Sequence, residues 1–202
     1  MEMPHASFRP GRSLLGTMVL VLLLTCFAAA TATATAATYR IDPAHASIHW
    51  KVQHLGFSTM VGRFNRFSGT FSYDPDARDT TPAVAIEIEM DSLDSNHSLR
   101  DKHLRADFFE TGKYPTATFK STSFKGDADG GELRGMLTMH GVSKEVAVAV
   151  RKVGEGKDPW GAYRAGFAAT ATIDRRDFGI DRNVGPNSWL VDLEIFIEGI
   201  RE

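Results

Sequence analysis

The sequence predicts an all-β protein that folds as one antiparallel barrel with a short helical segment lying across it. Along most of the chain apolar and polar residues alternate at period two, which gives each predicted strand one dry face and one wet face, as antiparallel sheets require. Turn-forming sequences separate these strands, and Asp129-Gly130-Gly131 is a strong hairpin signal. A sandwich would alternate in the same way, but glycines beside or within the strands allow the sharp bends of a closed barrel: Gly62, Gly69, Gly135, Gly141, Gly166 and Gly179. For Gly62 and Gly141 an ordinary turn is an equal alternative.

The predicted elements follow one another with short connections. Alternation is clearest in residues 47–53, 67–73, 84–90, 133–139, 146–150 and 189–198. The stretch 96–119 departs from it, because Leu99, His103 and Leu104 recur at helical spacing before the aromatic pair Phe108 and Phe109. This segment is the predicted helix.

Residues 1–37 have the layout of a secretory signal peptide and are expected to be removed. Arg9 and Arg12 form a basic start, residues 14–27 are apolar, and residues 28–37 are small, with several A-x-A cleavage patterns. A membrane anchor is the alternative, but the strongly apolar part is about half of the roughly 20 residues that span a bilayer. The sequence therefore predicts export to the periplasm and one domain over residues 38–202, a usual size for a single core.

The predicted mature domain contains no thiol, since the only cysteine of the chain, Cys26, lies within the apolar signal segment. Disulfides, cysteine nucleophiles and thiolate metal ligands are thereby excluded from it. The formal net charge of the chain is -2, and its basic residues are scattered among acids without a polybasic run. No nucleic-acid partner is expected.

Standard catalytic signatures are absent. There is no HExxH, no phosphate-binding glycine loop and no GxGxxG, and Gly56-Phe57-Ser58-Thr59-Met60 lacks the closing glycine of a nucleophile elbow. Six histidines follow the signal, but no local cluster supplies three ligands, so neither a metal nor a cofactor is expected. For His54 and His140 we expect a hydrogen bond to the backbone near a barrel rim, with contact to a ligand headgroup as the alternative. Residues 175–179, Arg-Arg-Asp-Phe-Gly, are expected to end a strand with Arg and Asp paired, with an anion site as the alternative.

Aromatic residues are more numerous than a barrel wall needs. Phenylalanines follow the signal at positions 57, 64, 67, 71, 108, 109, 119, 124, 167, 178 and 196, together with Trp50, Trp160 and Trp189. They could fill the core, or they could line a dry tunnel for a branched hydrocarbon. Burying a CH₂ contributes roughly 0.8 kcal/mol, whereas association costs about 4 to 15 kcal/mol, so useful affinity needs on the order of 20 buried carbons. This arithmetic favours a lipid over a small metabolite.

Several separated motifs resemble the YceI-like family of secreted, lipocalin-like, polyisoprenoid-binding proteins. They run in order as YRIDPAHASIHWKVQHLGFSTMVGRF, RDKHLRADFFETGKYPTATF, GMLTMHGVSKEV and RRDFGI, and they cover nearly the whole predicted domain. The resemblance implies an extended eight-stranded antiparallel barrel, covered by the helical segment, that binds a long polyisoprenoid such as a quinone tail. It brings no catalytic residues and no cofactor. By motif position the candidate lining residues are Trp50, His54, Phe64, Phe71, Phe108, Phe109, Leu137, Phe167 and Phe178.

The function expected from the sequence is storage or transport of a polyisoprenoid or isoprenoid quinone across the periplasm, without catalysis. Transient contact with a membrane and a homodimer are both compatible with it. One alternative is a cofactor-free hydrolase or isomerase for lipids, in which His54 and His140 would converge with a carboxylate inside the cavity. Another is a redox or haem-associated accessory protein that uses paired histidines.

Overall fold

A computed structural model describes residues 36–76 and 81–202 of the chain. The predicted signal peptide falls, except for its last two residues, outside the described part. The described chain runs through eleven strand segments: β1 (Ala37–Ile41), β2 (Ser47–His54), β3 (Ser58–Phe64), β4 (Phe67–Tyr73), β5 (Val84–Glu89), β6 (Leu93–Asp94), β7 (Thr116–Asp127), β8 (Gly130–Met139), β9 (Val142–Lys157), β10 (Tyr163–Asp174) and β11 (Leu190–Arg201). Four short helical pieces complete the described part of the chain.

Six of these segments are halves of bent strands. β1 and β2 both pair with β11 on one side, and on the other side β1 pairs with β4 and β2 pairs with β3. β1 and β2 are therefore the two halves of one bent wall strand, and β3 and β4 are the halves of the next. β5 and β6 pair with β4 and β3 in the same way, on either side of the 3-10 turn Met90–Ser92. The described residues thus build eight antiparallel wall strands.

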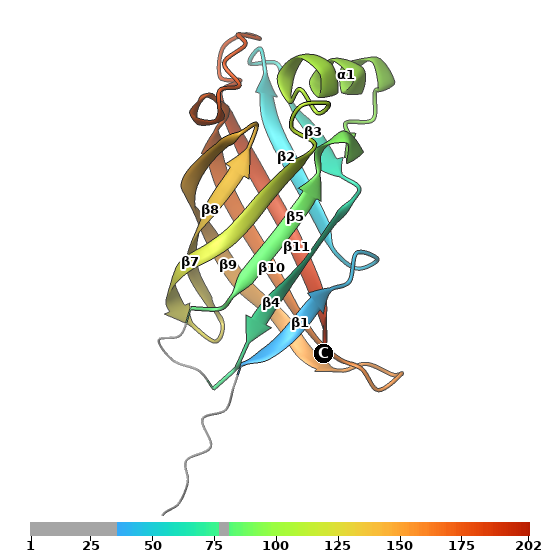
Figure 1. The fold of residues 1–202 in the computed structure, drawn as a ribbon, viewed down its shortest axis with the longest axis vertical. Helices are drawn as coiled ribbons and strands as arrows, with labels where there is room; N and C mark the ends of the chain where they lie inside the picture. Colours follow the sequence, from blue (N-terminus) through green and yellow to red (C-terminus); the bar gives the residue numbers. More distant parts are fainter. Residues whose placement is uncertain (1–35, 77–80) are drawn as a thin grey trace, which may run out of the picture. The chain divides into compact units, whose positions relative to one another are not determined.

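The first and last walls close the barrel. β1 pairs with β11 through Tyr39 and Arg201, and the remaining walls follow in chain order, each antiparallel to the next. Figure 1 shows the strands running obliquely around a long axis, as closure of a sheet requires. The predicted closed eight-stranded antiparallel barrel is confirmed.

The helical segment covers one end of the barrel (Figure 1). It consists of α1 (Ser98–His103) and a wider π turn, Leu104–Phe108. The ring of His97 caps the helix by accepting a hydrogen bond from the backbone N–H of Arg100 at 3.2 Å. Leu104, Phe108 and Phe109 pack against the buried core, so this end is closed by side chains.

The loop between β10 and β11 lies at the same end as α1. Its 3-10 turn, Arg175–Phe178, buries the Phe178 ring to 1% exposure. The hairpin between β8 and β9 is bound to this turn by a hydrogen bond, in which a ring nitrogen of His140 donates to the carbonyl oxygen of Phe178 at 3.0 Å. His140 and Gly141 both have positive φ, 53° and 76°, as a type I′ hairpin requires, so Gly141 is a turn glycine.

Gly62 lies in the middle of β3 and permits a close approach. A Cβ at this position would stand 2.1 Å from Cζ2 of Trp50, its cross-strand partner on β2. The Trp50 ring occupies this space and is buried to 7% exposure.

The described residues include no helix with the length and hydropathy of a membrane span.

Candidate functional site

The barrel encloses a cavity of about 320 Å³. Its walls are the inward rows of the strands, for example Val146, Val148 and Val150 on β9, which alternate with outward residues at period two. Pockets that bury small ligands have volumes of this order, and an eight-stranded barrel is wide enough to hold one such ligand. The cavity is therefore the candidate binding site.

The polar lining of this cavity gathers at one end. Its members are Ser72, Tyr73, Asp74, Thr81 and Asp127, which lie at the end of β4, just before β5 and at the end of β7. These positions are at the opposite end of the barrel from α1. Elsewhere the lining among the described residues is apolar or glycine. The site is thus a dry tunnel, closed at the helical end and polar at its mouth, a geometry that suits an amphiphile.

Four of the candidate residues from the sequence line this cavity: Phe64, Phe71, Leu137 and Phe167. Phe71 and Phe167 meet edge to face with their ring centroids 5.5 Å apart, and Tyr73 packs on Phe167 in the same manner at 5.2 Å. These three rings form an aromatic wall next to the mouth.

The other five candidates lie elsewhere. Trp50 and Phe178 are buried in the core, and Phe108 and Phe109, at the end of the helical segment, pack against that core at the closed end. His54 is exposed at the end of β2, beside the turn to β3. The motifs place these residues near the barrel, but only the fold shows that the closed end is filled by its own aromatic side chains.

Much of the lining is aliphatic and lies outside the candidate residues predicted from the sequence. Ile86 and Ile88 on β5 and Leu193, Ile195 and Ile197 on β11 all line the cavity. The period-two pattern assigns these residues to one face of a strand. Whether a row of such residues fills a core or lines a tunnel depends on barrel width, which no single strand encodes.

The histidines do not converge on the cavity, and none lines it within the described part of the chain. The other ring nitrogen of His140 contacts the Glu110 carboxylate at 2.8 Å, and Tyr114 packs on the ring with centroids 4.5 Å apart. His140 therefore connects segments that close this end of the barrel. Its hydrogen bond to the Phe178 carbonyl oxygen is the backbone bond expected from the sequence. His54, in contrast, is exposed at the end of β2, and its ring has no such hydrogen bond among the described residues.

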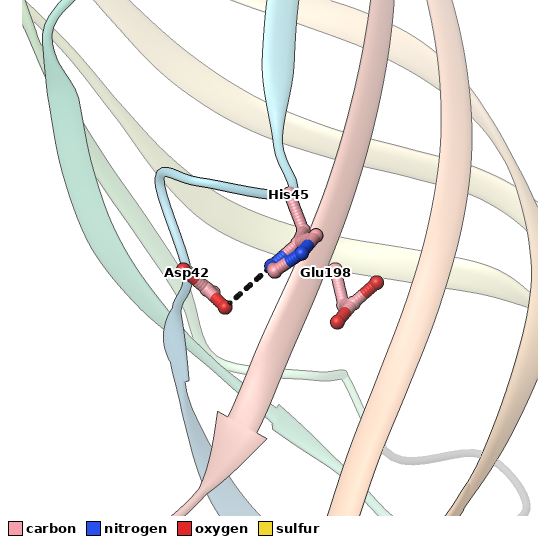
Figure 2. Close-up of side chains that lie close together, drawn as sticks. All are labelled: Asp42, His45 and Glu198. Atoms are coloured by element: carbon pink, nitrogen blue, oxygen red, sulfur yellow. Dashed lines mark hydrogen bonds and ion pairs between the residues drawn. The ribbon is translucent and has the colours of Figure 1, made fainter. Parts of the chain in front are cut away.

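One cluster outside the cavity has the composition of a metal site. Asp42, His45 and Glu198 bring ligand atoms within 4.8 Å of one another, at the bend between β1 and β2 and on β11 (Figure 2). The Arg164 guanidinium, however, donates to Asp42 at 2.8 Å and to Glu198 at 2.6 Å. A fixed positive charge thus already contacts an oxygen of each carboxylate, and we interpret the cluster as an ion-pair network that fixes the bend.

That network changes the acidity of its members. The hydrogen bond from Arg164, aided by the one from His45, lowers the pKa of Asp42 to about 2. Bonds to Asp158, Asp42 and Glu198 raise the pKa of Arg164. Both groups are thus charged across the physiological range.

The arginine pair after β10 is structural. Arg175 is buried to 6% exposure and donates to the carbonyl oxygens of Ser188 at 2.9 Å and Ile180 at 2.5 Å. Arg176 pairs with Asp174, where the sequence suggested Asp177. The Arg175 guanidinium is already used by backbone carbonyls, which leaves little of it for an anion.

Comparisons with known proteins agree with this geometry. The model of the YceI-like domain matches residues 39–199. A UPF0312 protein of Shewanella sp. (strain W3-18-1) is 49% identical over 196 residues, covering 95% of this chain and 99% of the relative. A UPF0312 protein of Pseudomonas paraeruginosa is 46% identical over 170 residues, covering 83% and 88%.

Solved structures share the fold. Burkholderia cenocepacia BcnA superposes with a TM-score of 0.69 at 20% identity, covering 78% of this chain and 98% of BcnA. The Campylobacter jejuni YCEI protein gives 0.67 at 29% identity, covering 75% and 91%. A polyisoprenoid binding domain from Saccharophagus degradans, implicated in plant cell wall breakdown, gives 0.61 at 17% identity, covering 83% and 100%.

A closed eight-stranded barrel around a dry cavity defines a lipocalin-like binding barrel. Within that class, the match over nearly the whole described chain and the closely similar relatives are decisive. The chain belongs to the YceI-like family, and the resemblance seen in the sequence is confirmed.

Proposed function

We propose that this protein binds a long polyisoprenoid, or the tail of an isoprenoid quinone, inside the barrel and stores or carries it across the periplasm. The observation that carries the proposal is the apolar tunnel with polar groups gathered at its mouth. Such a tunnel takes hydrocarbon from water and leaves a headgroup at the polar end. The Saccharophagus neighbour, described as a polyisoprenoid binding domain, supports the choice of ligand class.

The proposed place of action follows from the sequence. Residues 1–37 have the pattern of a cleaved signal peptide, and a barrel that shelters hydrocarbon is useful where a lipid must cross water between two membranes. Contact with a membrane during loading is part of this proposal. The homodimer considered from the sequence is not needed, because one chain encloses the cavity.

The proposed function is binding without catalysis. The lipid-modifying alternative requires His54 and His140 in the cavity with a carboxylate, whereas the structure places one on the surface and the other in the closed end. A redox or haem-associated role that uses paired histidines also lacks support, because His54 and His140 do not meet in the cavity. Unchanged lipid recovered after incubation with the protein would support binding over catalysis.

The test is to purify the exported protein, record native mass spectra and identify any extracted lipid by tandem mass spectrometry. A stoichiometric polyisoprenoid is the expected result. A protein that carries none and also takes up no added isoprenoid quinone would overturn the proposal.

A pair of tryptophan variants sharpens this test. Ala169 on β10 lines the cavity, so Ala169→Trp should fill the tunnel and weaken uptake of a quinone at least tenfold. Ala147 on β9 is exposed on the outer face, and Ala147→Trp should leave uptake unchanged. Circular dichroism and thermal melts establish that both variants are folded. Equal uptake by a folded Ala169→Trp variant would show that the ligand binds elsewhere.

A further inference from the structure

The inward-facing residues of β9 change from apolar to charged at the mouth of the barrel. Val146, Val148 and Val150 line the cavity, and Lys152 is the next member of the same row. On β10 its cross-strand partner is Phe167, which also lines the cavity. Directly paired residues on antiparallel strands project to one face, so Lys152 faces inward.

A β-bulge brings a carboxylate to the same face. Phe167 pairs with Lys152, but the preceding Gly166 pairs with Gly154, which leaves Val153 as the extra residue. Residues three apart on a regular strand project to opposite faces. Because of the bulge, Glu155 projects to the same face as Lys152. Lys152 Nζ donates to Glu155 Oε1 at 2.6 Å.

Two tyrosines complete what we call the mouth cluster, defined as Lys152, Glu155, Tyr73 and Tyr163. The hydroxyls of Tyr73 and Tyr163 donate to the two carboxylate oxygens of Glu155 at 3.4 and 3.3 Å. Lys152 Nζ also stands 5.3 Å from the Tyr73 ring centroid. The Lys152 and Glu155 side chains are 20% and 17% exposed, so they are largely withdrawn from water.

The mouth cluster adjoins the candidate binding cavity through Tyr73. This residue belongs to the cluster and also lines the cavity, where its ring packs on Phe167. A hydrocarbon chain that occupies the tunnel from the closed end outward would bring its headgroup to this side of the mouth. The polar lining residues gather at the same end.

The charges of the mouth cluster favour a neutral headgroup. The ammonium of Lys152 and the carboxylate of Glu155 cancel, and the hydrogen bond to Glu155 raises the pKa of Lys152, which keeps it charged. Of the three N–H groups of Lys152, one points to Glu155, so the ammonium retains donors for a ligand. Arg201 stands 5.8 Å from the Tyr163 ring but is exposed, and Asp74 and Asp127 in the lining add carboxylates that repel an anion.

We propose that the mouth cluster is the headgroup subsite of the barrel and selects a neutral, carbonyl-bearing ring such as that of a quinone over a phosphate of the same chain length. Lys152 donates to the carbonyl oxygen, Glu155 holds the ammonium in place, and the tyrosines hold Glu155. This subsite rests on the proposed function, since it requires an isoprenoid tail in the tunnel.

The test compares three probes that share a four-isoprene skeleton and differ in headgroup: menaquinone-4, geranylgeranyl phosphate and the hydrocarbon phytane. Dissociation constants are measured by titration and native mass spectrometry. Lys152→Met should weaken menaquinone-4 about tenfold, the value of one hydrogen bond from a charged donor, and leave phytane within about twofold. Lys152→Arg should retain menaquinone-4 binding. Glu155→Gln should strengthen binding of the phosphate about tenfold by removing the nearest repelling charge.

The matched control is Lys125→Met. Lys125 follows the lining residue Phe124 on β7, projects to the opposite face and is exposed, so its loss should change no dissociation constant. Tighter binding of the phosphate than of menaquinone-4 by the unaltered protein would overturn the selectivity. Unchanged menaquinone-4 binding by a folded Lys152→Met variant would overturn the subsite while leaving the tunnel intact. Failure of all three probes to bind the unaltered protein would overturn the proposed function itself and the subsite with it.

Discussion

At the scale of single residues, the contact of Trp50 with Gly62 sets the packing of the two strands that lead to the closed end. The indole ring occupies the space that a side chain on Gly62 would need. Because cores are packed densely, such a space cannot be shared without moving the ring.

Gly62→Ala should therefore lower the free energy of unfolding by about 1 to 3 kcal/mol, the usual cost of overpacking a core. Urea denaturation followed by tryptophan fluorescence measures it. Gly112→Ala is the control, since a Cβ there meets nothing within 4 Å and the change should be near neutral. Equal destabilisation by the two variants would contradict the packing argument.

The ion-pair network around Arg164 predicts how the stability of the fold depends on pH. The pKa of Asp42 falls to about 2 in the folded protein, below its ordinary value of 3.8. A carboxyl group with a lowered pKa stabilises the fold fully above its unfolded value, and this contribution disappears as the pH falls from about 5 towards 2. Asp42 should supply about 1 to 2 kcal/mol at pH 7 after allowance for solvent screening.

The variant Asp42→Asn should be less stable at pH 7 and should lose less stability between pH 5 and pH 2 than the unaltered protein. Urea unfolding at several pH values measures both quantities. Asp129→Asn changes an exposed turn carboxylate and should keep the original pH profile. A profile for Asp42→Asn that parallels the unaltered one would show that Arg164 does not act through Asp42.

Residue roles were predicted unevenly from the sequence. Phe64, Phe71, Leu137 and Phe167 lie on inward rows in the middle of strands, where period two and the motifs agree. Lys152 and Glu155 could not be placed on one face, because a regular strand predicts opposite faces and the bulge at Val153 leaves no clear sequence signal. Lys152 alone, as a charge that continues the inward row of Val146, Val148 and Val150, was the signal that could have drawn attention to this place.

At the scale of elements, the loop between β10 and β11 is held by one buried arginine. Arg175 donates to carbonyl oxygens of Ser188, Ile180 and Arg182 and stacks on the Trp189 ring at 4.4 Å. Within residues 36–76 and 81–202 no strand pairs with this loop to satisfy these carbonyls. The side chain therefore replaces the hydrogen bonds that a sheet would have supplied.

Arg175→Met should reduce the free energy of unfolding by about 3 kcal/mol, since it leaves buried carbonyls without donors. Hydrogen exchange should show loss of protection first in residues 180–189. The neighbouring Arg176 is exposed and pairs with Asp174, so Arg176→Met should cause a much smaller change. A uniform loss of protection over the whole barrel would instead mean that Arg175 supports the core.

The elements themselves were largely predictable. Alternating segments became strands, and the stretch with helical spacing became α1 and the π turn that follows it. The bends between β1 and β2 and between β3 and β4 were not predicted, because the alternation continues on both sides of each bend. The bend at Asp42 depends on Arg164, a residue of β10 that lies far away in the sequence.

At the scale of the whole molecule, the barrel was preferred over a sandwich on the strength of its glycines, and the family resemblance then specified eight strands. The pairing of β1 with β11 decides between the two folds, and it is a contact that no local pattern encodes. The cavity was expected from an excess of aromatic residues. In the structure many of those rings close the helical end, and aliphatic rows line much of the tunnel.

The seam between β1 and β11 has a consequence for the order of folding. The partners at this seam, Tyr39 and Arg201, lie near opposite ends of the described chain, so the barrel cannot close until the last strand is available. Until then β1 and β10 both present unpaired edges, which invite pairing with other chains. A chain that still lacks β11 thus remains an open sheet with two free edges. In that interval the free edges, and not the stability of the finished barrel, decide whether the chain pairs with its neighbours.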